Sequence, residues 1–474
     1  MQVTLPVADV LCVYGFPEGE LLEELKHWLN EEDARFVVVI EDDEKALMRG
    51  SEHERIRLCN GENEEALKQI AWEFVFLTFE YWKVPGNGAK NLEKMEALFA
   101  KMAFLQEGIH LVASDFQHRG IDLLTNFLRN SSCFSNASDG RDLFGAFKGV
   151  PAVICGAGAS LEMEAPYLRT LKDRALIFAG GTALSSLSQF SIQPHFGALI
   201  DPHPPSKRYF ENGAHAMPLF FQNRVHPTVL EQAQGPLLWI PGSRNDFLEK
   251  EMFDGGWNVS TFQAALACHL GCNPIILVGV DLAQSKDKHY AGDFERPEEG
   301  ELVPIEGGLF TRRDWIFAAD WLSHFAKLHP EVEWINASCG MEIAGFEKKP
   351  LHEVSFERQL DLQGEVYSAV LNLEKGMQRE NFGQSFEKVG ELCEKMLALL
   401  EQIYPNPVEK NGEYALLELE IEKEMAYVRF LRPIWDVWKH VFARQIPKEI
   451  PKVYGMGLNQ WLFMKGICDD ARKI

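Results

Sequence analysis

Two apolar segments about 120 residues apart constrain the fold of this chain more than any other part of its sequence. Residues 153–161 begin as an apolar run and then turn at Gly156 and Gly158, whereas residues 274–282 form an apolar run that reaches Asp281. Runs of Val, Ile and Leu without polar alternation are typical of parallel strands buried on both faces. Ligands bind at the carboxyl ends of such strands, so we expect a binding site at these two turns.

Length and charge limit the classes of partner. A chain of 474 residues predicts two or three domains. Its 70 Asp and Glu residues outnumber 47 Lys and Arg residues, giving a net charge of −23. Nucleic acids and anionic membranes are therefore not expected as partners, because their phosphates need clustered Lys and Arg. A small anionic ligand is compatible with this charge, because backbone N–H groups can hold it.

The cysteines and the lengths of the apolar runs indicate in which cellular compartment the protein is expected. The nine cysteines are scattered without a CxxC pair, which favours reduced, mostly buried thiols. No apolar run reaches the length of a membrane-spanning helix, and the N-terminal residues lack the basic start of a signal peptide. We therefore expect a cytoplasmic protein that does not associate with membranes.

The first 145 residues alternate predicted strands and helices, which indicates a parallel sheet. Strands are expected at 10–15, 35–40, 55–59 and 74–78. The first leads into a turn from Gly15 to Gly19 and the second ends in acidic residues, as in a Rossmann-type nucleotide site. This turn lacks the close glycine spacing through which a backbone approaches a pyrophosphate, so we favour a structural role over cofactor binding.

The remaining chain divides into an α/β part and a helical part. A polar stretch at 130–141 marks the first boundary. After about residue 350 the apolar residues repeat every three or four positions, which is typical of helices. The sequence thus predicts an α/β protein with two Rossmann-like parallel-sheet domains, at 1–145 and 146–346, followed by an all-helical C-terminal domain at 350–474.

A second glycine-rich turn, at the end of another predicted strand, strengthens the prediction of a nucleotide site. Glycines allow a ligand close to the backbone, and the helix N-termini that follow offer free N–H groups to an anion. The alternative for both turns is a tight strand-to-helix connection without a ligand. Seven residues are predicted to bind nucleotide or phosphate: Gly156, Gly158, Ser160, Gly180, Gly181, Thr182 and Asp201.

Two residues are predicted to be catalytic, Asp281 and His289. A carboxylate at a strand end can accept hydrogen bonds from a sugar or hold Mg²⁺, and a neutral imidazole is a suitable general base. His203, beside Asp201, is the competing base. The alternatives are helix capping or loop anchoring for the aspartates and a surface position for each histidine.

Several elements, taken in order, resemble the motility accessory factor (Maf) and MptE-like family. Residues 156–161 are similar to its GxGPSL turn, 192–202 to its GIxPD segment, 277–282 to its VGxDL strand, and 336–345 to its closing N-x-T-x-G-G element. The resemblance covers residues 150–346. Three positions depart from the pattern: Ala157, Ala159 and His195 stand in place of Asn, Pro and Asp.

This resemblance implies a nucleotide-dependent transferase. Maf proteins are implicated in moving nonulosonic, sialic-like sugars from CMP donors to flagellin hydroxyls, and MptE-like proteins transfer pyrophosphate from ATP to 6-hydroxymethyl-dihydropterin with Mg²⁺. We expect a Maf-type glycosyltransferase that uses a CMP-sugar donor, needs no metal and acts on an acceptor protein. In a pyrophosphokinase, Asp201, Asp281 and Asp293 would hold Mg²⁺. A non-catalytic interaction protein on the same scaffold is the third hypothesis.

Overall fold

The chain forms two compact units, and each is assembled from separate segments of the sequence. The first comprises Met1–Arg119, Gln402–Glu409 and Ile434–Gln460, and the second comprises Gly120–Glu401, Lys410–Pro433 and Trp461–Ile474. The computed structural model describes residues 5–15, 19–32, 34–42, 47–48, 53–83, 92–204, 216–242, 253–285, 291, 302–356, 361–376, 382–404, 412–447 and 449–473.

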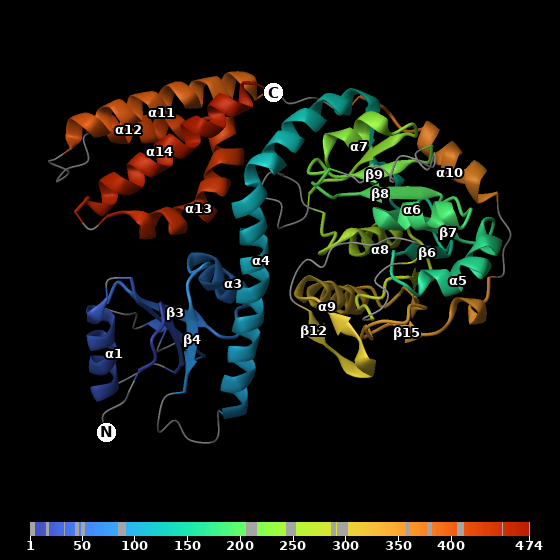
Figure 1. The fold of residues 1–474 in the computed structure, drawn as a ribbon, viewed down its shortest axis with the longest axis horizontal. Helices are drawn as coiled ribbons and strands as arrows, with labels where there is room; N and C mark the ends of the chain where they lie inside the picture. The colour runs from blue at the N-terminus through green and yellow to red at the C-terminus, as the bar shows by residue number, and fades with distance from the viewer. Residues whose placement is uncertain are drawn as a thin grey trace. The chain divides into compact units, whose positions relative to one another are not determined.

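The first unit contains a four-stranded parallel sheet in the order β3-β2-β1-β4. Figure 1 draws this sheet in blue, with β3 and β4 labelled. Its strands are β1 (Val10–Tyr14), β2 (Phe36–Glu41), β3 (Ile56–Asn60) and β4 (Phe79–Trp82). The prediction of a strand at 74–78 is wrong, because Phe74 ends a helix and Phe76 has a positive φ of 67°. The apolar residues there pack as a turn, and the fourth strand starts later.

Helices cover both faces of this sheet. The helix α1 (Glu20–Glu31) packs Leu25 and Leu29 with one set of strand residues, and α3 (Glu64–Glu73) packs with the alternate set. The α3 helix begins where the Asn63 side chain accepts a hydrogen bond from the N–H of Ala66, which satisfies a free donor of the first turn. A long helix, α4 (Leu92–Asn130), follows β4.

The second unit contains a nine-stranded sheet in which all neighbouring strands are parallel. Its order is β15-β14-β11-β6-β7-β8-β9-β10-β5. The strands are β5 (Ala137–Asp139), β6 (Ala152–Cys155), β7 (Leu176–Gly180), β8 (Phe196–Leu199), β9 (Leu219–Phe221), β10 (Leu237–Trp239), β11 (Ile275–Val278), β14 (Trp334–Asn336) and β15 (Glu347–Lys348). A separate hairpin pairs β12 (Val303–Pro304) with β13 (Phe310–Thr311).

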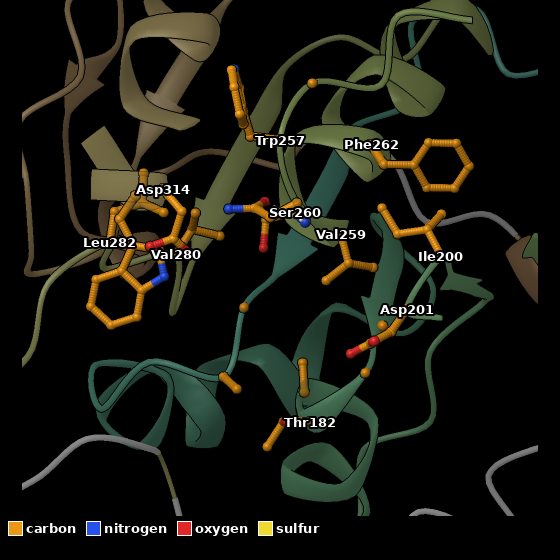
Figure 2. A pocket seen from close by; sticks show the side chains of 18 of the residues that line it. Thr182, Ile200, Asp201, Trp257, Val259, Ser260, Phe262, Val280, Leu282 and Asp314 are labelled. Carbon is orange, nitrogen blue, oxygen red and sulfur yellow. Dashed lines mark hydrogen bonds between the residues drawn. The ribbon is translucent and has the colours of Figure 1, made fainter. Parts of the chain in front are cut away.

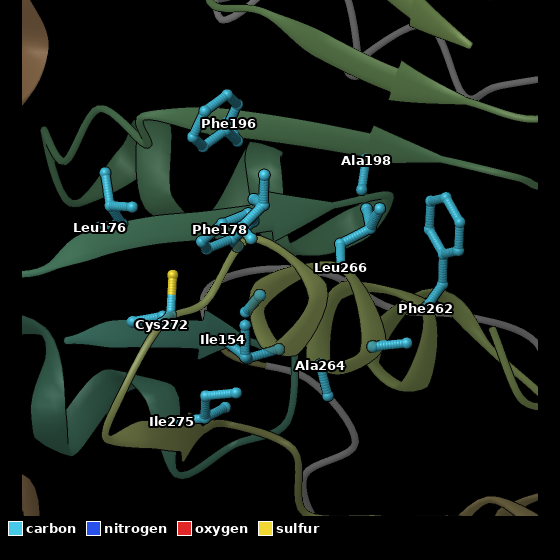
Figure 3. Close-up of a cluster of buried hydrophobic side chains, with 14 of the residues drawn as sticks. Ile154, Leu176, Phe178, Phe196, Ala198, Phe262, Ala264, Leu266, Cys272 and Ile275 are labelled. Carbon is cyan, nitrogen blue, oxygen red and sulfur yellow. The ribbon is translucent and has the colours of Figure 1, made fainter. Parts of the chain in front are cut away.

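Both faces of the large sheet are buried, which explains the continuous apolar strands. One face packs against α5 (Leu161–Leu168), α6 (Thr182–Gln189) and α7 (Pro227–Gln232). The other packs against α8 (Val259–His269), α9 (Arg313–Leu328) and α10 (Leu362–Leu371). Figure 3 shows α8 lying on the strands, with Ala264 and Leu266 near Ile154 and Phe178.

The C-terminal part of the described chain is helical, as predicted. It consists of α11 (Gly383–Ile403), α12 (Gly412–Ile421), a π-helical segment (Tyr427–Leu431), α13 (Arg432–Gln445) and α14 (Lys452–Ala471). Pro433 directly follows the π-helical segment inside a continuous helical run from residue 425 to 445. A proline inside a helix cannot donate a backbone hydrogen bond, and irregular turns of this kind are typical beside it. The predicted fold class, two Rossmann-like parallel sheets followed by helices, is confirmed, whereas the boundaries at 145, 346 and 350 stay a prediction.

Candidate functional site

A cavity of about 370 Å³ lies at the carboxyl ends of strands in the large sheet. Strands β7 to β10 follow β6 on one side, and β11 borders β6 on the other side although about 120 residues separate the two in sequence. This neighbourhood is the topological switch point of the sheet, where α/β proteins bind ligands. Ligand pockets typically measure about 300–1,000 Å³, so the cavity has room for a small organic ligand.

The first glycine turn packs directly on the end of β11. The N–H of Gly156 donates to Val278 O at 2.8 Å, and the N–H of Gly158 donates to Gly279 O at 2.8 Å. A Cβ at Gly156 would overlap Gly279 O, and a Cβ at Gly158 would overlap the Asp281 carboxylate. Glycine is therefore required here by the close contact of two protein segments, and both turn residues also line the cavity.

Asp281 is buried and bonds to two other segments of the chain, the first turn at Ser160 and the stretch from Cys339 to Met341. Its carboxylate accepts hydrogen bonds from the backbone N–H of Ser160 at 3.0 Å, from the Ser160 hydroxyl, and from the N–H of Cys339 at 3.3 Å. Its carbonyl accepts from Met341 N at 2.8 Å. The geometry matches the loop-anchoring alternative for Asp281, which nevertheless lines the cavity. The backbone N–H and the hydroxyl of Ser160 both donate to this carboxylate, so a contact between Ser160 and a phosphate stays a prediction.

The second glycine turn presents an uncapped helix to the cavity. Gly180, Gly181 and Thr182 all line the cavity, and no side chain caps α6 at Gly181. Gly181 has a φ of 52°, and a Cβ there would meet open space. The first N–H groups of an uncapped helix point outward and attract anions. The N–H groups at the start of α6 are therefore not taken up by a capping side chain, and the binding of a phosphate at this turn stays a prediction.

A third turn reaches the cavity and was not predicted from the sequence. Gly255 and Gly256 precede Asn258, whose side chain accepts hydrogen bonds from Ser260 N at 2.9 Å and Thr261 N at 3.0 Å. This capping box starts α8. The two adjacent glycines resemble those at 180–181, and Asn258 is a typical helix-capping residue, so this signal was present in the sequence.

Charged residues from four segments face the cavity. Figure 2 shows Thr182 and Asp201 on one side, and Leu282 and Asp314 on the opposite side. Asp201 is exposed, and its Oδ1 lies 2.5 Å from Nδ1 of His203. Arg224 and Arg312 also line the cavity and supply positive charge.

Arg312 is held by its neighbours on α9. Its Nη2 lies 2.7 Å from Asp314 Oδ2, and its guanidinium lies 4.5 Å from the ring centre of Trp315. No periodicity in the sequence marks this arginine, which follows a short hairpin. Arg224, in contrast, follows β9, and polar residues at the end of a predicted strand were a usable signal.

Two predicted residues, His289 and Asp293, lie outside the described part of the chain. Between them, Ala291 is buried, and its N–H donates to Ala157 O at 2.9 Å on the first turn. Ala291 therefore contacts the first turn at Ala157, which lines the cavity, while the roles of His289 and Asp293 stay predictions.

The described residues alone do not complete a divalent-metal site at Asp281. Its Oδ1 accepts hydrogen bonds from the Ser160 hydroxyl and from Cys339 N, and its Oδ2 accepts one from Ser160 N, so the protein already uses most of its lone pairs. Within the described ranges, no three His, Cys, Asp or Glu residues converge as a metal site. We therefore route no chemical step through a metal at this carboxylate.

Comparisons with known proteins agree with the resemblance seen in the sequence. Residues 125–287 match the family model described as 6-hydroxymethylpterin diphosphokinase MptE-like. A solved structure, the Maf glycosyltransferase from Magnetospirillum magneticum AMB-1, aligns with a TM-score of 0.63 at 17% identity and covers 98% of this chain and 79% of that chain. No curated protein sequence matches the chain.

The family match supports the resemblance to the MptE-like family over residues 125–287. The structural match shows that nearly the whole chain shares its fold with that Maf glycosyltransferase. In the part of the chain that the structure describes, no helix is long and apolar enough to cross a membrane.

Proposed function

We propose that this protein is a Maf-type glycosyltransferase that moves a nonulosonic sugar from a CMP donor to a protein hydroxyl. The observation that carries the proposal is the cavity at the switch point of the large sheet, where an uncapped helix N-terminus and two arginines face the same space. Glycosyl transfer from a nucleotide sugar leaves negative charge on a phosphate. Oriented N–H groups and guanidinium groups stabilise such charge as it develops.

In this proposal the second glycine turn and Arg224 and Arg312 bind the nucleotide phosphate. Asp281 orders the cavity wall through Ser160 and Cys339 and does not transfer a proton. His289 takes the proton of the acceptor hydroxyl as the glycosidic bond forms, and the phosphate leaves with the electron pair of the broken bond.

The second candidate is the ATP-dependent pyrophosphokinase named in the matching family model. It differs from the first candidate by its requirement for Mg²⁺. The three hydrogen bonds that the Asp281 carboxylate already accepts count against it, because they reduce the capacity of Asp281 to hold Mg²⁺ with Asp201 and Asp293.

Thermal unfolding with CMP, CTP and ATP, each with and without Mg²⁺, tests the proposal. A ligand that binds only the folded state adds about 2.7 kcal/mol to the free energy of unfolding at a hundredfold excess over Kd. This added stability raises the melting temperature. We expect CMP and CTP to raise it without Mg²⁺. A shift that needs both ATP and Mg²⁺ would favour the pyrophosphokinase, and no shift with any nucleotide would favour a non-catalytic protein.

A further inference from the structure

The last turns of α4 contact the cavity loops through two buried asparagines. Asn126 and Asn130 lie four residues apart, which places them on one face of the helix. They are 5% and 1% exposed. The loops after β8 and β9 run past this face, and these loops carry the cavity residues Asp201 and Arg224.

Each asparagine amide donates to two backbone carbonyls. Asn126 Nδ2 donates to Pro202 O at 3.0 Å and to Arg224 O at 3.1 Å, and so joins the two loops. Asn130 Nδ2 donates to Asn223 O at 2.8 Å and to Val225 O at 2.6 Å. Four carbonyl acceptors around two amides also fix which end of each side chain is the nitrogen.

A backbone bond between the loops completes this arrangement. The N–H of His226 donates to Asp201 O at 3.0 Å. Buried carbonyls that lose their donors cost free energy, because no water replaces the lost bond. The backbone at Asp201 and Arg224 therefore depends on the two amides for its position.

A neighbouring face of α4, which carries Phe127, packs against the C-terminal helices of the same unit. The ring of Phe127 lies 5.1 Å from that of Phe430 in the π-helical segment. The Arg429 guanidinium lies 5.3 Å from the Phe127 ring and 5.1 Å from the Phe382 ring. Aromatic packing on this face and amide bonds on the adjacent face leave this part of α4 little freedom to move away from the loops.

We propose that Asn126 and Asn130 are positioning residues that hold the two loops carrying Asp201 and Arg224 in place at the cavity. Their effect on ligand binding rests on the proposed function, because it assumes that a nucleotide binds this cavity. The asparagines themselves need not touch the ligand. They act through the carbonyl groups to which they donate.

Amide hydrogen exchange on the full-length chain tests the proposal without a ligand. We expect Asn130→Ala, and separately Asn126→Ala, to increase deuterium uptake in both loops, at 200–204 and 222–226, because local opening there becomes easier. The matched control is Asn273→Ala, whose side chain also bonds backbone groups, of Glu331 and Glu333, but at the opposite edge of the sheet. Uptake in both loops equal to that of the control would overturn the proposal.

Calorimetric titration with CMP tests the consequence for binding. We expect CMP affinity to fall on the order of tenfold in each asparagine variant, as the loss of about one net hydrogen bond predicts, and to change less than twofold in Asn273→Ala. Loosened loops with unchanged CMP affinity would overturn the positioning role. If the unsubstituted protein does not bind CMP, the proposed donor is wrong, and the exchange measurement still decides whether the asparagines hold the loops.

Discussion

Gly158 shows how a motif glycine can serve packing between protein segments. A Cβ at this position would overlap the Asp281 carboxylate, which is itself fixed by Ser160 and Cys339. The same glycine lines the cavity, so the sequence alone could not separate packing from ligand contact. In the structure, it is the Asp281 carboxylate, a part of the protein itself, that requires glycine at position 158.

We expect Gly158→Ala to lower the free energy of unfolding by about 1–3 kcal/mol, because the added methyl group must displace a buried carboxylate. Urea denaturation measures this change. The control is Gly466→Ala on an exposed face of α14, where a Cβ meets no atom within 4 Å and helix propensity favours alanine by up to about 1 kcal/mol. Equal effects of the two substitutions would contradict the packing argument.

His195 links stability to pH. It is 1% exposed, its Nδ1 accepts a hydrogen bond from Ile177 N, and burial lowers its pKa from 6.5 to about 4. Below pH 6.5, His195 binds a proton in the unfolded chain, whereas in the folded protein it stays neutral down to about pH 4. Stability should therefore be complete above pH 6.5 and fall toward pH 4, with about 3 kcal/mol attributable to this residue.

Unfolding free energies measured between pH 7 and pH 4 check this expectation. Burial also lowers the pKa of His226 and of His269, so the total slope exceeds the share of His195. The variant His195→Asn isolates that share, because asparagine retains an acceptor but does not titrate. An identical pH slope in the variant would show that His195 does not contribute.

Among the elements, the strands were more predictable than the helices that complete the site. Strands β6, β7 and β11 are buried on both faces, and this environment requires continuous apolar sequence. The glycine turns that follow these strands could also be predicted, because each comes at the end of a continuous apolar run. The strand predicted at 74–78 failed because the apolar run there forms the end of a helix and a turn at Phe76.

The residues missed at the site share a physical reason. Asn126 and Arg312 reach the cavity region from distant segments, and only the tertiary path of the chain brings them together. A polar residue in a helix or after a hairpin carries no local signal of its partners. Arg224 and the turn before α8 were exceptions, because a polar residue at a strand end and two glycines with an Asn cap can be recognised in sequence.

The π-helical segment at Tyr427–Leu431 should be important for stability. Phe430 is fully buried, and its ring contacts those of Phe127, Phe382 and Phe386 at centroid distances of 5.1, 4.9 and 5.9 Å. We expect Phe430→Ala to cost about 3–5 kcal/mol in the free energy of unfolding, because it leaves a cavity among aromatic rings. Guanidinium denaturation measures this loss.

Leu416→Ala on α12 is the control for this aromatic cluster. Leu416 is 68% exposed, and surface substitutions of this kind usually change stability by less than about 0.5 kcal/mol. A comparable loss of unfolding free energy in both variants would contradict a particular contribution of this aromatic cluster to stability.

At the scale of the whole molecule, the C-terminal helices belong partly to the core of the large sheet. Leu362, Val366 and Val370 of α10 are buried in the same cluster as Ile154, although they lie beyond the predicted boundary at 350. We expect a chain ending at residue 346 to lose cooperative unfolding, because it exposes this face of the core and removes Phe430. Near-ultraviolet circular dichroism with thermal unfolding tests this, and a sharp transition in the shortened chain would contradict it.

The pairing of β6 with β11 has a consequence for how the protein folds. Bringing these neighbours together closes a loop of about 120 residues, and such distant contacts are formed slowly because chain entropy must be lost first. The cavity is therefore completed late, after β6 to β10 can already have paired in chain order. A ligand of the completed cavity has nothing to bind before that step. It should slow unfolding while leaving the rate of refolding unchanged.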